Sequence, residues 1–225
     1  METFFKNVAY EDAENIEQAS RLIFELRENR LALLKPYEVA DEAALLERIK
    51  AGQLAEHPAY EHYLSGQILG NTRESLRAEL AGHLEQMVGN PAPGGASAIP
   101  EDTRVHHIEL QQQLETVYAG QLDGTPQLLQ DALVLCFDSG LVLEMRIASA
   151  DEYAFHWLWG EGELSIDTAP IHPDAGTFPH HFHDEEGRIL ADPVTRPGRA
   201  PMENIRALID ALLINPLLTD PAPRR

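Results

Sequence analysis

Residues 132–160, ALVLCFDSGLVLEMRIASADEYAFHWLWG, contain three short runs rich in valine, leucine and aromatic residues. The turn sequences DSG (138–140) and SAD (149–151) separate these runs, and a fourth run, ELSID, follows at 163–167. Short apolar runs at a spacing of roughly ten residues, with tight turns between them, are typical of antiparallel strands. The pattern therefore predicts an antiparallel meander instead of alternating strands and helices.

The chain before this stretch has the apolar spacing of helices. Pro36 is expected to end the first helix, Pro58 to lie in the first turn of the third, and Asn71 to cap the fourth. The sequence thus predicts an α+β fold, in which a helical N-terminal region is followed by a small antiparallel β-sheet with a packed C-terminal helix. The predicted helices span residues 12–34, 41–52, 58–68, 71–87, 102–118 and 201–213.

The segment GNPAPGGASAIP, residues 89–100, carries no charged residue and is rich in proline, glycine and alanine. This composition is typical of linkers and exposed loops. We therefore expect a helical region over residues 1–88, a linker or exposed loop over 89–100, and an α+β domain over 101–225.

The sequence is strongly acidic, because 17 lysines and arginines against 37 aspartates and glutamates give a formal net charge of −20. Such a surface repels nucleic-acid phosphates and anionic lipids, so neither generic duplex DNA nor a membrane is an expected partner. A basic protein fits this charge, and a homo-oligomer is also compatible with it. The N-terminal residues lack the pattern of a signal peptide and Cys136 is the single cysteine, so we expect a cytoplasmic protein.

Four of the ten histidines lie in residues 167–184, DTAPIHPDAGTFPHHFHD. If this segment is extended, His181 and His183 project from one face and His180 from the other. Two imidazoles at alternate positions can bind one metal ion or act as a general acid and base. We take His181, His183, Asp167 and His172 as candidate catalytic residues, and His181, His183 and His172 as candidate ligands of a divalent metal ion. A purely structural role, with the imidazoles bonded to the backbone of a proline-rich loop, stays open.

The other histidines have weaker patterns. His156 lies between two aromatic residues of a predicted strand, so alternation places it on the opposite, solvent-facing side. His57, with Tyr60 and Glu61, is expected to be a surface or capping residue of a helix. The sequence contains no P-loop, no GxGxxG, no GxSxG and no CxxC pair, which argues against common nucleotide-binding and serine hydrolase sites.

Three segments, YAFHW (153–157), DTAPIHP (167–173) and TFPHHFH (177–183), precede a predicted helix. In this order they resemble the TumE family of toxin–antitoxin proteins, which are small prokaryotic chains. The resemblance covers about residues 128–214, and its most specific part is the motif TFPHHxH. Thr168, Ile171 and Phe182 stand where the family pattern has asparagine, histidine and lysine. The positions that match are Asp167, Ala169, Pro170, His172, Phe178, Pro179, His180, His181 and His183.

The resemblance implies a toxin–antitoxin or defence-associated protein with an antitoxin-like or basic protein as its partner. The acidic charge and the absence of the family's lysine favour action mainly through protein–protein interaction. The alternative is a histidine-dependent nuclease or phosphodiesterase-type effector, with or without a metal ion. This alternative needs a local basic patch, for which the candidates are Arg146, Arg188, Arg196, Arg199 and Arg206.

Overall fold

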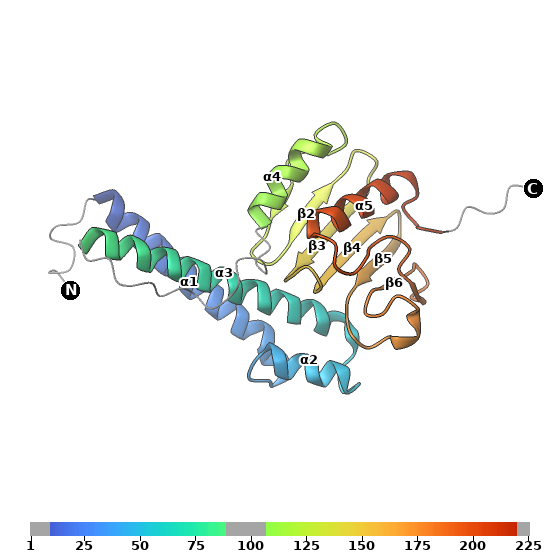
Figure 1. Cartoon of the computed structure of the whole chain (residues 1–225), viewed down its shortest axis with the longest axis horizontal. Helices are drawn as coiled ribbons and strands as arrows, with labels where there is room; N and C mark the ends of the chain where they lie inside the picture. Colours follow the sequence, from blue (N-terminus) through green and yellow to red (C-terminus); the bar gives the residue numbers. More distant parts are fainter. Residues whose placement is uncertain (1–9, 89–106, 220–225) are drawn as a thin grey trace, which may run out of the picture.

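The structure is a computed structural model that describes residues 10–88 and 107–219 (Figure 1). Its described part contains one seven-stranded sheet in which every strand pairs with the strand that follows it in sequence. All six pairings are antiparallel, so the predicted meander is confirmed. The strands are β1 (Gln127–Leu128), β2 (Leu133–Cys136), β3 (Val142–Ile147), β4 (Tyr153–Trp159), β5 (Gly162–Asp167), β6 (His181–His183) and β7 (Ile189–Ala191).

One face of the sheet packs against α4 (His107–Tyr118) and α5 (Pro201–Ile214). Strand alternation directs Phe155 and Trp157 into this layer, where they form a cluster of buried side chains with Leu208 and other residues of α5. Each buried aromatic side chain contributes about 1.5–3 kcal/mol relative to an exposed one. This layer is therefore the main hydrophobic core, and α5 is the packed C-terminal helix that the sequence predicted.

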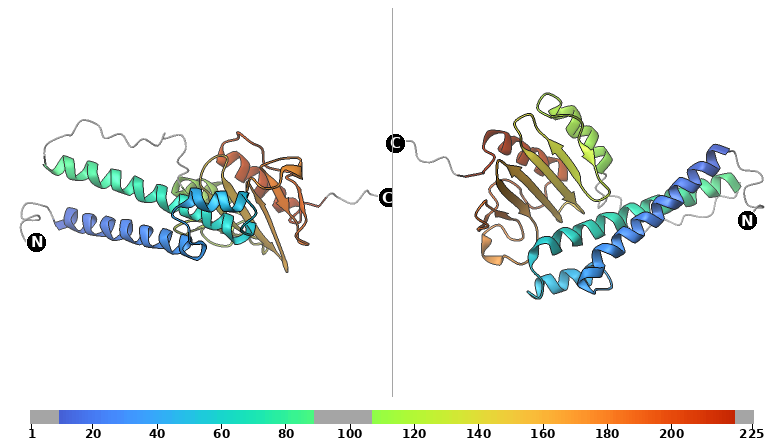
Figure 2. Two further views of the ribbon diagram at one scale, coloured as in Figure 1. Left: turned by 90° about the horizontal axis from the view of Figure 1, so that it is seen from below. Right: turned by 180° about the vertical axis from the view of Figure 1, so that it is seen from behind.

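The opposite face of the sheet is covered by α3 (Glu56–Val88), which packs in turn against the N-terminal helices α1 (Tyr10–Leu34) and α2 (Glu42–Lys50). Helix α3 contacts β3 and β4, and Tyr60 and Leu64 of α3 pack near Ala154 of β4 in a second buried cluster. Small side chains on this face let the helix approach closely. In Figures 1 and 2, α1 and α3 run antiparallel, and their far ends extend beyond the sheet.

The fold class predicted from the sequence is confirmed, but the predicted boundary between the third and fourth helices was wrong. The third and fourth predicted helices form one helix, α3, and Asn71 lies inside it instead of capping a new one. A single glycine such as Gly70 costs a helix only about 1 kcal/mol and does not end it. The predicted linker at 89–100 lies outside the described residues, and the predicted domain boundaries stay a prediction. No described helix is long and apolar enough to span a membrane.

A bidentate ion pair connects the N-terminal helices to one another. The Arg30 guanidinium of α1 donates two hydrogen bonds of 2.6 Å to the buried Glu42 carboxylate of α2. Glu42 lies directly against Gly66 of α3, where an added Cβ would come within 2.5 Å of its Oε1 and 2.8 Å of its Cγ. Gly66 is therefore required for the close approach of the three helices, since any larger residue would displace the Glu42 carboxylate.

We predict opposite effects for the same substitution at two glycines of α3. Gly66→Ala should destabilise the protein by roughly 1–3 kcal/mol, because it displaces one partner of a buried hydrogen-bonded ion pair. Gly82→Ala, where an added Cβ meets nothing within 4 Å, should stabilise it by up to about 1 kcal/mol through helix propensity. Urea unfolding of both variants measures the two free energies. Equal effects of the same sign would show that Glu42 and Gly66 are not in contact.

Candidate functional site

Strand pairing places the predicted site residues on the face of the sheet that α3 covers. Asp167, the last residue of β5, pairs with His181 of β6, and Ser165 pairs with His183. Because side chains alternate, Phe182 points into the opposite core while His181 and His183 share the α3 side. The extended HxH segment thus projects two imidazoles from one face, as the sequence predicted.

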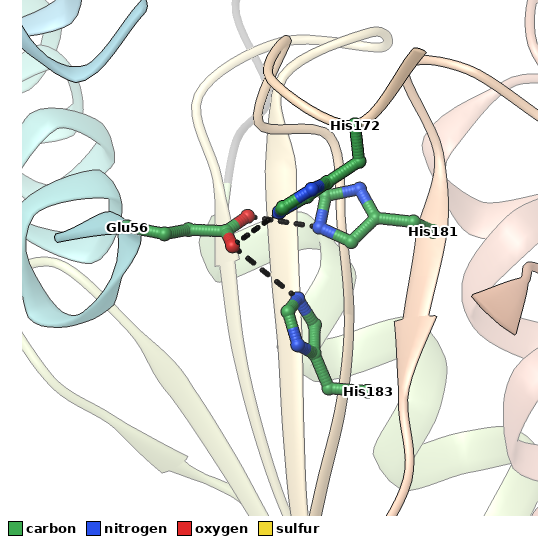
Figure 3. A group of neighbouring side chains, drawn as sticks. All are labelled: Glu56, His172, His181 and His183. Carbon is green, nitrogen blue, oxygen red and sulfur yellow. Dashed lines mark hydrogen bonds and ion pairs between the residues drawn. The ribbon is translucent and has the colours of Figure 1, made fainter. Parts of the chain in front are cut away.

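Helix α3 contributes a carboxylate to these imidazoles. The Glu56 carboxylate lies at the start of α3, and its Oε1 is 2.8 Å from Nε2 of His181. Its Oε2 is 2.7 Å from Nε2 of His172 and 3.6 Å from Nε2 of His183. Figure 3 shows the three rings converging on this single side chain from the sheet and from the loop that carries His172. Glu56 and His181 are 125 residues apart in sequence.

Asp167 lies beneath the same rings and is 0% exposed. Its Oδ1 accepts a hydrogen bond from the backbone N–H of Ala169 at 2.9 Å and lies 3.3 Å from Nε2 of His181. Its Oδ2 lies 3.4 Å from Nε2 of His183 and 3.9 Å from Nε2 of His57. Among the residues that the structure describes, Oδ2 has no hydrogen-bond partner of acceptable geometry. A buried anionic oxygen of this kind is costly unless a positive charge lies beside it.

A second group of polar side chains continues from this point along α3. Nδ1 of His57 lies 2.5 Å from Oε1 of Glu61, and Nε2 of His156 on β4 lies 2.8 Å from the same oxygen. Nε2 of His57 is turned the other way, 3.4 Å from Nε2 of His183. Glu61 therefore orients His57 so that its second nitrogen faces the first group.

We call six of these residues the histidine–carboxylate cluster: Glu56, His57, Asp167, His172, His181 and His183. The cluster lies between α3 and the strands β5 and β6, and its members come from the start of α3 and from residues 167–183. Three sets of its residues and their neighbours have ligand atoms that all lie within 4.8 Å of one another, which is close enough to hold a metal ion. These sets are Glu56, His172, His181 and His183; Glu56, His57, Asp167 and His183; and His57, Glu61 and His156.

The carboxylates stabilise the protonated, positively charged form of histidines in the cluster. Burial opposes protonation of His183, but the Asp167 and Glu56 carboxylates outweigh it and raise its pKa to about 9. Burial is likewise outweighed by carboxylate neighbours at His181 and His57, whose pKa values are raised. His181 donates from Nδ1 to the Pro179 carbonyl oxygen at 2.9 Å, so its contact with Glu56 requires a second proton on Nε2. Burial raises the pKa of the Glu56 carboxyl, but hydrogen bonds from the imidazoles lower it to well below its usual range.

A family model described as Toxin TumE matches residues 101–214 of the chain. The chain belongs to the TumE toxin family. A second model, described as the uncharacterized protein MJ0235 family, matches residues 10–86. No curated protein and no solved structure matches the chain. Membership indicates a protein of toxin–antitoxin type and confirms the resemblance seen in the sequence.

The TumE match contains Asp167, His172, His181 and His183, whereas Glu56 lies in the region matched by the second model. The structure brings these four predicted residues together, and their catalytic and metal-binding roles stay predictions. His180 points into the opposite core, as alternation predicted, where its Nδ1 lies 2.7 Å from the hydroxyl of buried Tyr153. Glu56 was not predicted as a site residue from the sequence.

Two expectations about other residues were wrong. His57, Tyr60 and Glu61 were expected to be surface or capping residues of a helix, but Tyr60 and Glu61 are buried and His57 faces the cluster. His156 was expected to face solvent, but α3 covers that side of the sheet and Glu61 contacts it. The signal that was available is the closeness of His57 and Glu61 in sequence, since His57 lies in extended backbone just before the first helical turn and its ring reaches Glu61.

The basic patch required by the nuclease hypothesis is in part neutralised. Arg146 pairs with Glu144 and lies 3.5 Å from Asp131. Arg188 donates to Asp184 at 2.6 Å. Both guanidinium groups are therefore occupied by carboxylates and are less available to a phosphate backbone.

The raised pKa of His183 predicts how the stability of chelator-treated protein depends on pH. The charged form of His183 is stabilised in the folded state, so this contribution is complete below its unfolded pKa of 6.5 and is lost as the pH rises through about 9. Denaturant unfolding at a series of pH values should show the free energy of unfolding falling across this range. In His183→Gln the fall should be smaller. Identical profiles would contradict the assigned charge.

Proposed function

We propose that this chain is the toxin of a toxin–antitoxin pair and that the histidine–carboxylate cluster is a metal-dependent centre that hydrolyses phosphate esters. The observation that carries this proposal is the convergence of three Nε2 atoms, from His172, His181 and His183, on the Glu56 carboxylate. Family membership supports the assignment as a toxin. The geometry of the cluster supports metal-dependent hydrolysis of phosphate esters.

The donor set suits a divalent first-row metal ion. Imidazole nitrogens with one carboxylate oxygen are typical ligands of zinc and related ions. His172, His181, His183 and Glu56 would hold the ion, since one ligand atom of each lies within 4.8 Å of the others. The charges agree as well, because the carboxylates that raise the pKa values of His181 and His183 favour a metal cation in the same place.

When bound, such an ion supplies Lewis acidity toward a phosphoryl oxygen and toward an attacking water. His57 is the cluster residue that solvent reaches most readily, with 37% of its side chain exposed. Its Nδ1 is hydrogen-bonded to Glu61 and its Nε2 faces the cluster, so His57 marks the side from which solvent and a substrate would reach the cluster. Asp167, which is fully buried, holds His181 and His183 in place.

A second candidate function is action through a protein partner alone. The observations that favour it are the net charge of −20 and the exposed apolar residues of α1, among them Phe24 and Leu31. An acidic surface with apolar side chains fits a basic, antitoxin-like protein in the cytoplasm. In this case the cluster would fasten α3 to the sheet and would have no part in a reaction.

Substitution of the cluster separates the two functions. We predict that Glu56→Gln, which keeps the shape but removes the charge, and His181→Ala/His183→Ala abolish growth inhibition in cells. Both variants should lower hydrolysis of single-stranded RNA or a nitrophenyl phosphodiester by at least ~100-fold. The matched control is His62→Ala/His83→Ala, which removes two histidines outside the cluster and should retain activity.

Circular dichroism and thermal unfolding should accompany these assays to show that each variant is folded. Growth inhibition that persists in a folded Glu56→Gln variant would overturn the hydrolytic centre and favour the partner-based function. Duplex DNA should be a poor substrate for every variant, because the acidic surface repels it.

A further inference from the structure

The two carboxylates of the cluster, Glu56 and Asp167, have a similar arrangement of neighbours. Glu56 presents Oε1 to His181, and it presents Oε2 to His172 at 2.7 Å, to His183 at 3.6 Å and to His57 at 3.9 Å. Asp167 presents Oδ1 to His181 at 3.3 Å, and Oδ2 to His183 at 3.4 Å and to His57 at 3.9 Å. Each carboxylate thus has one oxygen beside His181 and the other beside His57 and His183.

The four imidazole rings form a row in the order His172, His181, His183 and His57. The ring of His172 packs against the ring of His181, with centroids 4.6 Å apart, and is 6.0 Å from the ring of His183. The rings of His181 and His183 are 4.8 Å apart. The rings of His57 and His183 pack against each other at 4.7 Å. His172 and His181 form one side of this row, and His183 and His57 form the other side.

The second side has an unsatisfied group. Oδ2 of Asp167 has no hydrogen-bond partner within residues 10–88 and 107–219, although the residue is fully buried. It faces the Nε2 atoms of His57 and His183. An anionic oxygen and two imidazole nitrogens around one point are three of the four ligands of a tetrahedral metal site.

Glu61 fixes the orientation of the His57 ring on this second side. Its Oε1 lies 2.5 Å from Nδ1 of His57, which leaves Nε2 of His57 directed at Asp167 and His183. A metal-binding histidine usually donates a hydrogen bond from its other ring nitrogen to a carboxylate or carbonyl oxygen. This bond sets the tautomer and the orientation of the ring. Glu61 is itself buried, and His156 contacts it from β4.

We infer that the cluster binds two divalent metal ions, one held by His172 and His181 and the other by His57 and His183, with Glu56 and Asp167 bridging them. This inference rests on the proposed function and deepens it: His172 and His181 stay with the first ion, whereas His183, which can reach either position, goes with His57 to the second. Ions that share two carboxylates lie roughly 3.5–4 Å apart, the separation at which two metals bind one phosphoryl group from both sides. The substrate class is therefore a phosphate ester, and Glu61 is a positioning residue for the second ion.

The test is metal stoichiometry of the full-length protein purified without a histidine tag. Protein saturated with zinc or manganese and freed of excess ion should contain two ions per chain by inductively coupled plasma mass spectrometry. His57→Gln should contain one, and Glu61→Gln should bind the second ion at least ~10-fold more weakly. His62→Gln, a change five residues further along the same helix, is the matched control and should retain two.

Electron paramagnetic resonance of the manganese-loaded protein provides a second readout. Two ions bridged by carboxylates should give an exchange-coupled spectrum, which His57→Gln should convert to that of an isolated ion. One ion per chain that His57→Gln does not affect would overturn the second position and leave the proposed function standing. Two ions retained in folded His57→Gln would overturn the assigned ligands. No bound ion would overturn both proposals.

Discussion

The structure depends on how buried negative charge is balanced between α3 and the sheet. Glu56, Glu61 and Asp167 are carboxylates largely removed from water, and each such charge costs several kcal/mol unless a positive charge lies beside it. The imidazoles of His57, His181 and His183, whose pKa values are raised, can supply that charge as imidazolium ions, and a metal ion bound by neutral imidazoles can supply it as well. The same electrostatic requirement therefore fastens α3 to the sheet and creates an affinity for cations.

The cluster also unites the two parts of the chain that match different families. Asp167 and the histidines of β6 belong to the TumE match, and Glu56, His57 and Glu61 belong to the region matched by the MJ0235 family. Neither part contains the whole cluster. Helix α3 thus completes the set of candidate ligands, and it also buries them. The hydrolytic centre that we propose is consequently a property of the full chain.

Local patterns predicted one half of the cluster. Strand alternation places His181 and His183 on one face from the spacing HxH alone, and the chain order puts Asp167 and His172 in the segment just before them. The other half could not be predicted, because Glu56 lies 125 residues from His181 and nothing in the sequence shows that α3 packs on this face of the sheet. The same missing contact explains why His57 was expected to be a surface or capping residue and His156 to face solvent. In the structure α3 packs on the sheet, so His57 faces the cluster and Glu61 contacts His156. The sheet was predictable for the opposite reason, since its strands pair only with their neighbours in sequence.

The most direct measurement is anomalous diffraction at the metal absorption edge, from crystals of untagged full-length protein grown with zinc. The account predicts an anomalous peak between Glu56 of α3 and the histidines of β6, about 2.0–2.1 Å from their Nε2 atoms. A structure with no peak at this position, in which the Glu56 carboxylate lies away from His172, His181 and His183, would contradict the account.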